Sequence, residues 1–248
     1  MRWLSFFGGF LLLFLVYHVA EFFPSFWVMA LTKVGFLPLS YLLARWQGWK
    51  GLGGYGLGLQ GRWWRFLAAG LLIGMLFFGL SEGLSLLAGF TRVVAFHGWE
   101  SYGQKWPLLV LYTVFPSVAE DILTRGYLFG HLHNRFRPAG WMLCSAGVFT
   151  LNHIWRLGED PSVWAYLFLL GCALAWTVVQ TRSLWLAFGI HWGSNLAFES
   201  SNTLVSLEET GSHYESTWVL AGCWLVLLGL LFAAGRRWQG GFFSRQAS

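Results

Sequence analysis

Five ionisable side chains lie inside apolar stretches of this sequence and have the types that proton transfer requires. Glu120 and Asp121 are adjacent, Arg125 follows in the same stretch, and two later stretches carry His153 and His191. Stretches of this length and apolarity are typical of lipid-embedded helices, where an ionisable side chain at the bilayer centre costs about 2.5–3.5 kcal/mol. Because a carboxylate near imidazoles can remove a proton from water, these residues indicate general acid–base chemistry such as hydrolysis.

Helical spacing separates Glu120 from its neighbours. Residues four apart share one face of a helix, so Asp121 and Arg125 are expected to pair. Adjacent residues point about 100° apart, which leaves Glu120 on another face without a local partner. Two interpretations of the pair stay open, since it either braces the helices or takes part in chemistry. For Glu120 we favour chemistry.

The two histidines lie on different segments from Glu120. His191 and Asn195 are four apart, so an imidazole and a carboxamide project toward one place, and Asn152 stands beside His153. A lone buried histidine is usually a hydrogen-bonded core residue, but two of them with an unpaired glutamate favour a site. The helical rise places Glu120 and His153 about 20 Å, Asn195 about 16 Å and His191 about 10 Å above the cytoplasmic boundary, so His191 needs helix tilt to join them.

Other polar residues within apolar stretches have simpler interpretations. Lys33 and Glu82 lie at matching depths of the second and third stretches, which predicts an ion pair between these helices. His18 and Glu21 lie near the end of the first stretch and are expected at the membrane interface. The glycine-rich segment 48–65 is expected to be either a short interfacial segment or a flexible loop.

The elements that must position these residues are membrane helices. Hydrophobic residues make up 56% of the chain and charged residues 11%, and the mean hydropathy of +0.54 excludes an ordinary water-soluble domain. The fold class predicted is an all-α, polytopic transmembrane helix bundle forming one membrane-embedded domain over residues 1–248, with a motif core at about 107–200. About eight spans are expected: Trp3–Phe23, Phe26–Ala44, Phe66–Phe90, Pro107–Leu132, Gly140–Trp155, Val163–Val179, Leu184–Ser200 and Thr217–Ala234.

The distribution of charge predicts the orientation. The net charge of +5 does not indicate nucleic-acid binding, because the basic residues occupy short loops and form no stripe. Alternating spans place three basic residues on one side, Arg92, Lys105 and Arg156, and eleven on the other: Arg2, Arg45, Lys50, Arg62, Arg65, Arg135, Arg137, Arg182, Arg236, Arg237 and Arg245. Both termini are therefore expected in the cytoplasm. Compact loops without N-x-S/T sites favour a bacterial inner membrane.

Three motifs resemble those of a known family. Glu120-Asp121-Ile-Leu-Thr-Arg125, Phe149-Thr-Leu-Asn-His153 and His191-Trp-Gly-Ser-Asn195 are similar, in order and spacing, to the EExxxR, FxxxH and HxxxN motifs of the CPBP family, also called the Abi or CAAX protease family. The resemblance covers residues 116–195, and Asp121 departs from it because the family usually has Glu there. It implies an intramembrane endopeptidase with catalytic Glu120, His153, His191 and Asn195, supported by Asp121, Arg125 and Phe149.

By this resemblance, Glu120 is the general base that activates water with help from His153, while His191 and Asn195 hold the oxyanion. A second version uses Glu120, His153 and His191 as zinc ligands; zinc therefore stays possible, but no cofactor is assigned, and the absence of an HExxH signature favours the metal-free version. The expected substrate is a membrane-associated or hydrophobic-tailed polypeptide within the lipid bilayer. A proton-coupled transporter and a non-catalytic immunity or assembly protein remain alternatives.

Overall fold

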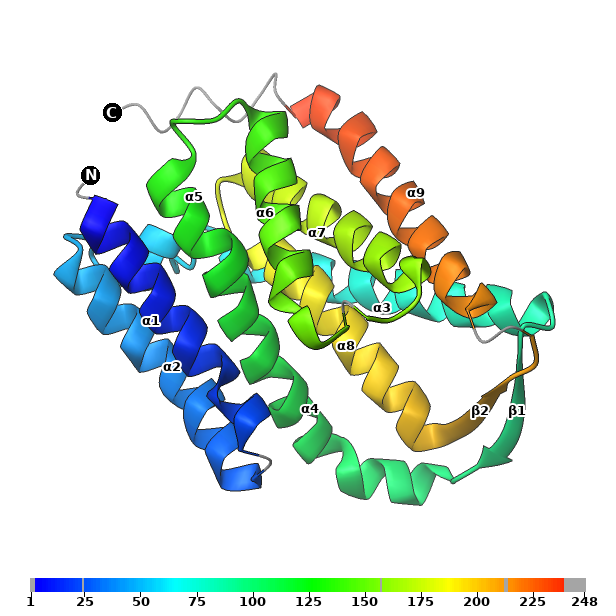
Figure 1. Ribbon diagram of the computed structural model, residues 1–248. Helices are drawn as coiled ribbons and strands as arrows, with labels where there is room; N and C mark the ends of the chain where they lie inside the picture. The colour runs from blue at the N-terminus through cyan, green and yellow to red at the C-terminus, as the bar shows by residue number, and fades with distance from the viewer. Residues whose placement is uncertain (1–2, 24, 157, 212–213, 239–248) are drawn as a thin grey trace.

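The computed structural model describes residues 3–23, 25–156, 158–211 and 214–238, and nearly all of these are helical (Figure 1). The first half contains α1 (Trp3–Phe22), α2 (Phe26–Trp46), the short helix η1 (Leu52–Tyr55), α3 (Trp63–Leu87) and strand β1 (Thr91–Phe96). The second half contains α4 (Trp99–Asp121), η2 (Ile122–Gly126), α5 (Tyr127–Leu132), α6 (Pro138–Asn152), η3 (Ile154–Arg156), α7 (Pro161–Thr181), α8 (Trp185–Leu204), strand β2 (Val205–Glu209) and α9 (Glu215–Trp238).

The chain is a multi-pass membrane protein. Within the described residues, six helices are long and apolar enough to cross a membrane: α1, α2, α3, the continuous helix Trp99–Leu132, α7 and α9. Many large apolar side chains on these helices are exposed, for example Leu4, Leu31, Leu72 and Leu87. Exposed apolar side chains are stable against lipid, and the helices that carry them satisfy their own backbone hydrogen bonds there.

The eight predicted spans each correspond to a helix, with ends that agree within a few residues except that the fourth helix begins at Trp99 instead of Pro107, but two of the helices differ from a membrane span in length or hydropathy. α6 has 15 residues, a length of about 22 Å, which is shorter than the apolar core of a bilayer. α8 has 20 residues, but polar side chains such as His191, Asn195 and Glu199 lower its hydropathy. Both helices carry motif residues, Phe149 on α6 and His191 and Asn195 on α8.

α8 lies at the centre of the bundle, where it contacts α3, α4 and α7. Glycines allow a close approach to α3, since a Cβ on Gly189 would lie 2.9 Å from the Cα of Gly70, and one on Gly193 would lie 3.0 Å from the Cα of Leu71. Small residues at such crossings are typical of membrane helix packing. The crossing fixes the helix that carries His191 and Asn195.

The helix that carries Glu120 changes its winding just after the acidic residues. α4 ends at Asp121, η2 is a π-helical turn, and α5 continues the same long helix. The Ser145 hydroxyl of α6 donates a hydrogen bond of 2.9 Å to the Thr124 carbonyl within this turn. Single π-helical turns occur frequently at functional sites because the inserted residue redirects the side chains around it.

A two-stranded antiparallel sheet was not expected from the sequence. β1 follows α3 and precedes α4, β2 follows α8, and the pairing aligns Thr91 with Glu209 and Phe96 with Val205. Arg92 and Glu208 face each other across the strands with a 2.7 Å ion pair. The sheet therefore connects two loops that lie far apart in the sequence (Figure 1).

The predicted Lys33–Glu82 ion pair is wrong. The Lys33 amine donates a 2.7 Å hydrogen bond to the Tyr17 carbonyl of α1 and makes no ion pair with Glu82. The helices that carry them have different neighbours, because α2 packs on α1 and α4, whereas α3 packs on α8 and α9. Matching depth alone did not determine which helices are adjacent.

The segment between α2 and α3 is packed against the bundle rather than free. Its η1 turn buries Tyr55, whose hydroxyl donates a 3.0 Å hydrogen bond to Gln47, and burial raises the pKa of this tyrosine. The Leu184 amide donates a 2.8 Å hydrogen bond to the Gly56 carbonyl. Of the basic residues used to predict the orientation, Arg2 and Arg245 lie outside the described residues.

Candidate active site

Two of the predicted site residues, His153 and His191, lie close to the carboxylate of a third, Glu120. Its Oε1 lies 3.6 Å from His153 Nδ1, and its Oε2 lies 3.7 Å from His191 Nε2. Glu120 and His191 are buried, at 5% and 3% exposure, while the His153 side chain is 24% exposed. A carboxylate between two imidazoles from separate helices is arranged to accept and pass on a proton.

The supporting residues form a second layer beneath this cluster. Asp121 and Arg125 make a fully buried ion pair, and Asp121 Oδ1 lies 3.3 Å from His191 Nδ1, so the carboxylate also faces the second histidine. Phe149 lies under the Arg125 guanidinium at 4.2 Å and meets both imidazoles edge-on, with ring centroids 4.9 Å from His153 and 5.7 Å from His191. The three residues hold both imidazoles in place through packing and charge.

Asn195 lies beside the cluster rather than within it. Its Nδ2 donates a 2.9 Å hydrogen bond to Ser117 Oγ, one helical turn before Glu120 on α4. No hydrogen bond joins Asn195 to Glu120, His153 or His191 in the described part of the chain. The Asn195 carboxamide therefore lies beside the three ionisable groups, where it lines a pocket together with Ser25 of the α1–α2 connection.

The sequence analysis assigned no role to Asn152, which makes the shortest hydrogen bond to the Glu120 carboxylate. Asn152 Nδ2 donates to Glu120 Oε1 at 2.9 Å, and Asn152 Oδ1 lies 3.0 Å from His18 Nε2. His18 Nδ1 lies 2.5 Å from Glu21 Oε2, and Trp155 also donates to that oxygen. These contacts form a chain of hydrogen bonds from Glu21 to Glu120.

His18 lies near the end of α1 as expected, and it is buried, with 3% exposure, in contact with α6. The chain of hydrogen bonds also fixes donors and acceptors. Since a carboxamide oxygen only accepts, His18 Nε2 must carry the hydrogen, and the Asn152 amide group must face Glu120. The signal in the sequence was the position of Asn152 within the FxxxH motif, directly before His153.

The short α6 ends directly beside Glu120. The helix ends at Asn152, and His153 Nδ1 donates a 2.9 Å hydrogen bond to the Phe149 carbonyl at its end. The following loop is held by Arg156, whose two 2.9 Å hydrogen bonds to Glu159 lower the pKa of that carboxylate. The end of α6 consequently brings Asn152 and His153 to Glu120.

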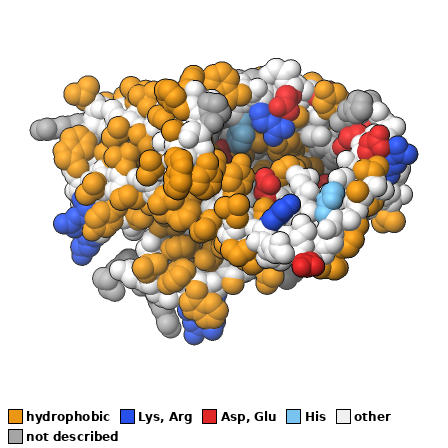
Figure 2. Space-filling view, turned by 90° about the horizontal axis from the view of Figure 1, so that it is seen from below, with side chains coloured by type: hydrophobic (Ala, Val, Ile, Leu, Met, Phe, Trp, Pro, Cys, Tyr) orange, Lys and Arg blue, Asp and Glu red, His pale blue; other side chains and the backbone are white. Residues whose placement is uncertain are grey.

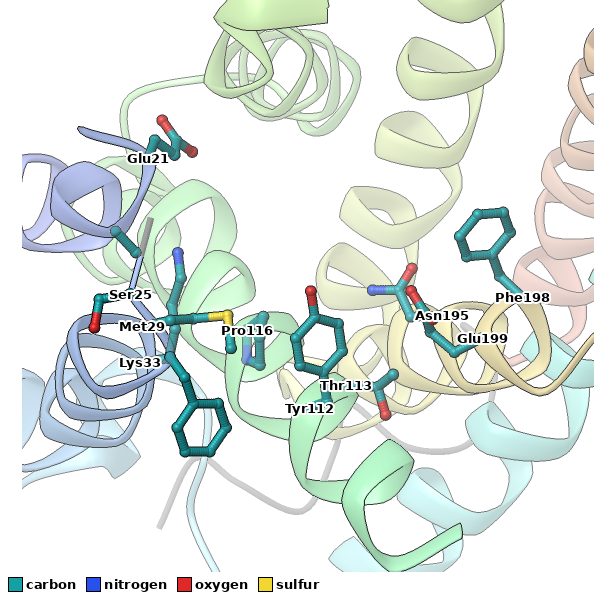
Figure 3. A pocket seen from close by; sticks show the side chains of 12 residues that line it. Glu21, Ser25, Met29, Lys33, Tyr112, Thr113, Pro116, Asn195, Phe198 and Glu199 are labelled. Atoms are coloured by element: carbon teal, nitrogen blue, oxygen red, sulfur yellow. The ribbon is translucent and has the colours of Figure 1, made fainter. Parts of the chain in front are cut away.

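A pocket of about 580 Å³ adjoins the cluster. Its wall is formed by the α1–α2 connection, α2, α4 and α8, with Lys33 and Asn195 on opposite sides of Tyr112 (Figure 3). Pro116, one turn before Glu120, also lines it. Seen from the end that carries the α1–α2 connection, the molecule has a hollow with charged and histidine side chains around it, whereas much of the neighbouring surface is apolar (Figure 2).

The cluster does not fit a zinc site. The described residues include no group of three or more His, Cys, Asp or Glu side chains placed to hold a metal ion. His153 faces Glu120 with Nδ1, which carries hydrogen because it donates to a carbonyl, and a protonated ring nitrogen has no lone pair for a metal. The set Glu120, His153 and His191 is thus arranged for hydrogen bonding.

A buried acid with two histidines inside a polytopic helix bundle is an arrangement that suits general acid–base chemistry. Residues 102–197 match the family model described as type II CAAX prenyl endopeptidase Rce1-like, which confirms the resemblance to the CPBP family. The matched region contains all three motifs and supports membership of an intramembrane endopeptidase family. Comparisons with curated proteins and with solved structures gave no match.

Proposed function

We propose that this protein is a metal-free intramembrane endopeptidase in which Glu120 activates water against a peptide bond of a membrane-associated or hydrophobic-tailed polypeptide. The observation that carries the proposal is the placement of Glu120, which accepts from Asn152 at 2.9 Å and faces His153 and His191 at 3.6 and 3.7 Å, beside a pocket. The family match supports the same activity.

In the proposed reaction, Glu120 takes a proton from water as the oxygen attacks the carbonyl carbon. His153 assists by orienting the water, since its ring lies beside the carboxylate, with Nδ1 3.6 Å from Glu120 Oε1. His191 and Asn195 donate to the oxyanion of the tetrahedral intermediate, which is the usual way to stabilise this charge. Breakage of the C–N bond then returns the proton from Glu120 to the leaving amine.

We further infer that the protein lies in a bacterial inner membrane with both termini in the cytoplasm. The first turn of α1 and the last turn of α9 lie at one end of the bundle, while the α1–α2 connection lies at the other (Figure 1). Glu21 in the last turn of α1 and Ser25 of that connection line the pocket. In this orientation the site receives water from the non-cytoplasmic side.

The test is cleavage of a fluorescent prenylated peptide ending in Cys-aliphatic-aliphatic-X by the purified protein in lipid nanodiscs. The wild type is compared with Glu120→Gln and with a sample treated with a chelator. We expect the substitution to abolish turnover, because Gln cannot accept the proton, and the chelator to have no effect. Loss of turnover under chelation would refute the metal-free mechanism.

A matched control is Glu100→Gln, which changes the same side chain at the exposed start of α4 and should leave turnover unchanged. Equal turnover by wild type and Glu120→Gln would refute the assignment of the base. A phenotype that survives Glu120→Gln would favour the non-catalytic immunity or assembly protein, and activity that requires an ion gradient would favour the transporter.

A further inference from the structure

Two adjoining cavities lie along α1 and α2, at the end of the bundle opposite the α1–α2 connection (Figure 1). The first has a volume of about 390 Å³ and apolar walls that include Leu12 and Leu39. The second has a volume of about 690 Å³ and a more polar wall that includes Gln47 and His131. Three residues line both cavities: Leu4, Ser5 and Trp46. The two cavities therefore form one continuous groove, the α1–α2 groove.

The α1–α2 groove has about the length of one bilayer leaflet. From Leu4 to Leu12, α1 rises about 12 Å, and half of an apolar core of ~30 Å is about 15 Å. Because α2 ends at Trp46, the polar cavity lies at the level of the lipid headgroups and the apolar cavity at the level of the acyl chains. Gly8 keeps the apolar part open, since a Cβ on this residue would meet no atom within 4 Å.

Hydrogen bonds hold the polar end of the groove in shape. Gln47 Nε2 donates to the Ser5 carbonyl at 3.2 Å and to the Tyr127 hydroxyl at 2.9 Å, which ties the end of α2 to α1 and α5. Gln47 Oε1 also lies 3.2 Å from His131 Nε2. A cavity whose wall is already fixed loses little conformational freedom when a ligand binds.

The polar end of the groove is surrounded by positive charge. Three exposed basic residues stand beside it: Arg45, Lys50 and Arg135. The first two are chain neighbours of the wall residues Trp46 and Trp49, and the guanidinium of the third lies 4.8 Å from the centroid of the Trp3 ring. None of the three makes an ion pair with a carboxylate in the part of the chain that the structure describes. Basic pockets at the ends of membrane helices are typical sites for anionic lipid headgroups.

We propose that the α1–α2 groove binds one anionic phospholipid, with an acyl chain in the apolar cavity and the phosphate of the headgroup at the polar cavity. The groove opens on a surface of exposed side chains such as Leu4 and Leu42, which face the lipid of the membrane. The basic residues at its polar end select a negatively charged headgroup. The inference is independent of the proposed function, because no residue of the three motifs lines either cavity. The bound lipid packs against α1, whose other end carries His18 of the hydrogen-bond chain to Glu120.

The experiment measures lipid binding to the delipidated full-length protein by native mass spectrometry. Phosphatidylglycerol and phosphatidylethanolamine with the same acyl chains are titrated against the wild type, Gly8→Leu and Arg45→Gln/Lys50→Gln. We expect the wild type to bind one phosphatidylglycerol more tightly than phosphatidylethanolamine. The double variant should weaken phosphatidylglycerol binding by about 25-fold, at about 5-fold for each basic residue, and leave phosphatidylethanolamine binding unchanged. Gly8→Leu should weaken binding of both lipids by about 10-fold, because about two CH₂ groups of the acyl chain lose their place in the groove.

Matched controls lie on α3, which does not line the groove. Arg62→Gln/Arg65→Gln removes two exposed basic residues at the start of α3, and Gly79→Leu fills another open glycine position, so both should bind phosphatidylglycerol as the wild type does. Equal losses in these controls would show unspecific lipid contact and overturn the site. Unchanged phosphatidylglycerol binding in Arg45→Gln/Lys50→Gln would overturn the headgroup assignment, and unchanged binding in Gly8→Leu the acyl-chain assignment. Displacement of the lipid by a farnesylated peptide in the wild type but not in Gly8→Leu would show that the groove holds an isoprenoid and refute the proposal.

Discussion

Asn152 offers a sharp test of how the Glu120 carboxylate is held. Asn152→Ala removes the 2.9 Å hydrogen bond from Nδ2 to Glu120 Oε1 and also the acceptor of His18. Both groups are buried, so no bulk water replaces the lost partner directly. If Glu120 is the base, the substitution should lower kcat by letting the carboxylate leave the position from which it takes a proton from water, with a smaller effect on KM.

The magnitude follows from the charge of the acceptor. A hydrogen bond to a charged group contributes about 1.5–3 kcal/mol, and a tenfold change in rate corresponds to about 1.4 kcal/mol. Asn152→Ala should therefore lower kcat by about 10- to 150-fold, which is less than the complete loss expected for Glu120→Gln. Asn152→Asp is the matched comparison, and it should be more damaging because it places a second carboxylate against Glu120.

The double variant His18→Ala/Asn152→Ala tests whether His18 acts through Asn152. His18 does not touch Glu120 in the described hydrogen-bond chain, so its removal should matter only while the carboxamide is present. We expect His18→Ala to lower kcat by about 3- to 10-fold, the effect of one ordinary hydrogen bond, and the double variant to match Asn152→Ala alone. If the fold-loss of kcat in the double variant equals the product of the losses in the two single variants, His18 does not act through Asn152, and its positioning role is refuted.

Three further predictions concern the scaffold. Asp121→Asn should lower the free energy of unfolding by about 3–5 kcal/mol, measured by thermal unfolding in detergent, because it leaves the buried Arg125 charge unpaired; unchanged stability would contradict this. Gly70→Leu should prevent assembly of the bundle, seen as aggregation in size-exclusion chromatography, whereas the same change at the open Gly79 should be tolerated. Arg92→Gln should change stability by at most about 1 kcal/mol, since its ion pair with Glu208 is exposed, and a larger loss would show that the strand pairing depends on it.

Much of the fold was readable from the sequence because the bilayer imposes a length and an apolarity on each helix. The span ends were located within a few residues except at the start of α4, which begins eight residues earlier than expected, and the Asp121–Arg125 pair followed from its spacing within one helix. The motif residues Glu120, His153 and His191 lie together as expected. Their catalytic roles stay predictions, because proximity alone does not test a reaction.

The features that the sequence did not reveal depend on which helices are neighbours. Lys33 and Glu82 match in depth, yet α2 and α3 pack against different helices. Asn152 and His18 gain their roles because α6 stops early and faces α1, and no periodicity marks that contact. β1 and β2 pair two short loops more than a hundred residues apart, which local propensity does not predict.

The strand pair has a consequence for how the protein responds to its lipid surroundings. β1 leads directly into α4, which carries Glu120, and β2 leaves α8, which carries His191, while a 2.8 Å hydrogen bond from the His97 amide to the Leu204 carbonyl extends the ladder. Bilayers of different thickness change helix tilt and slide neighbouring helices past each other. Because the ladder ties these two helices at one end, their relative height is held constant. The carboxylate and its histidine should thus stay aligned in short-chain and long-chain lipids alike.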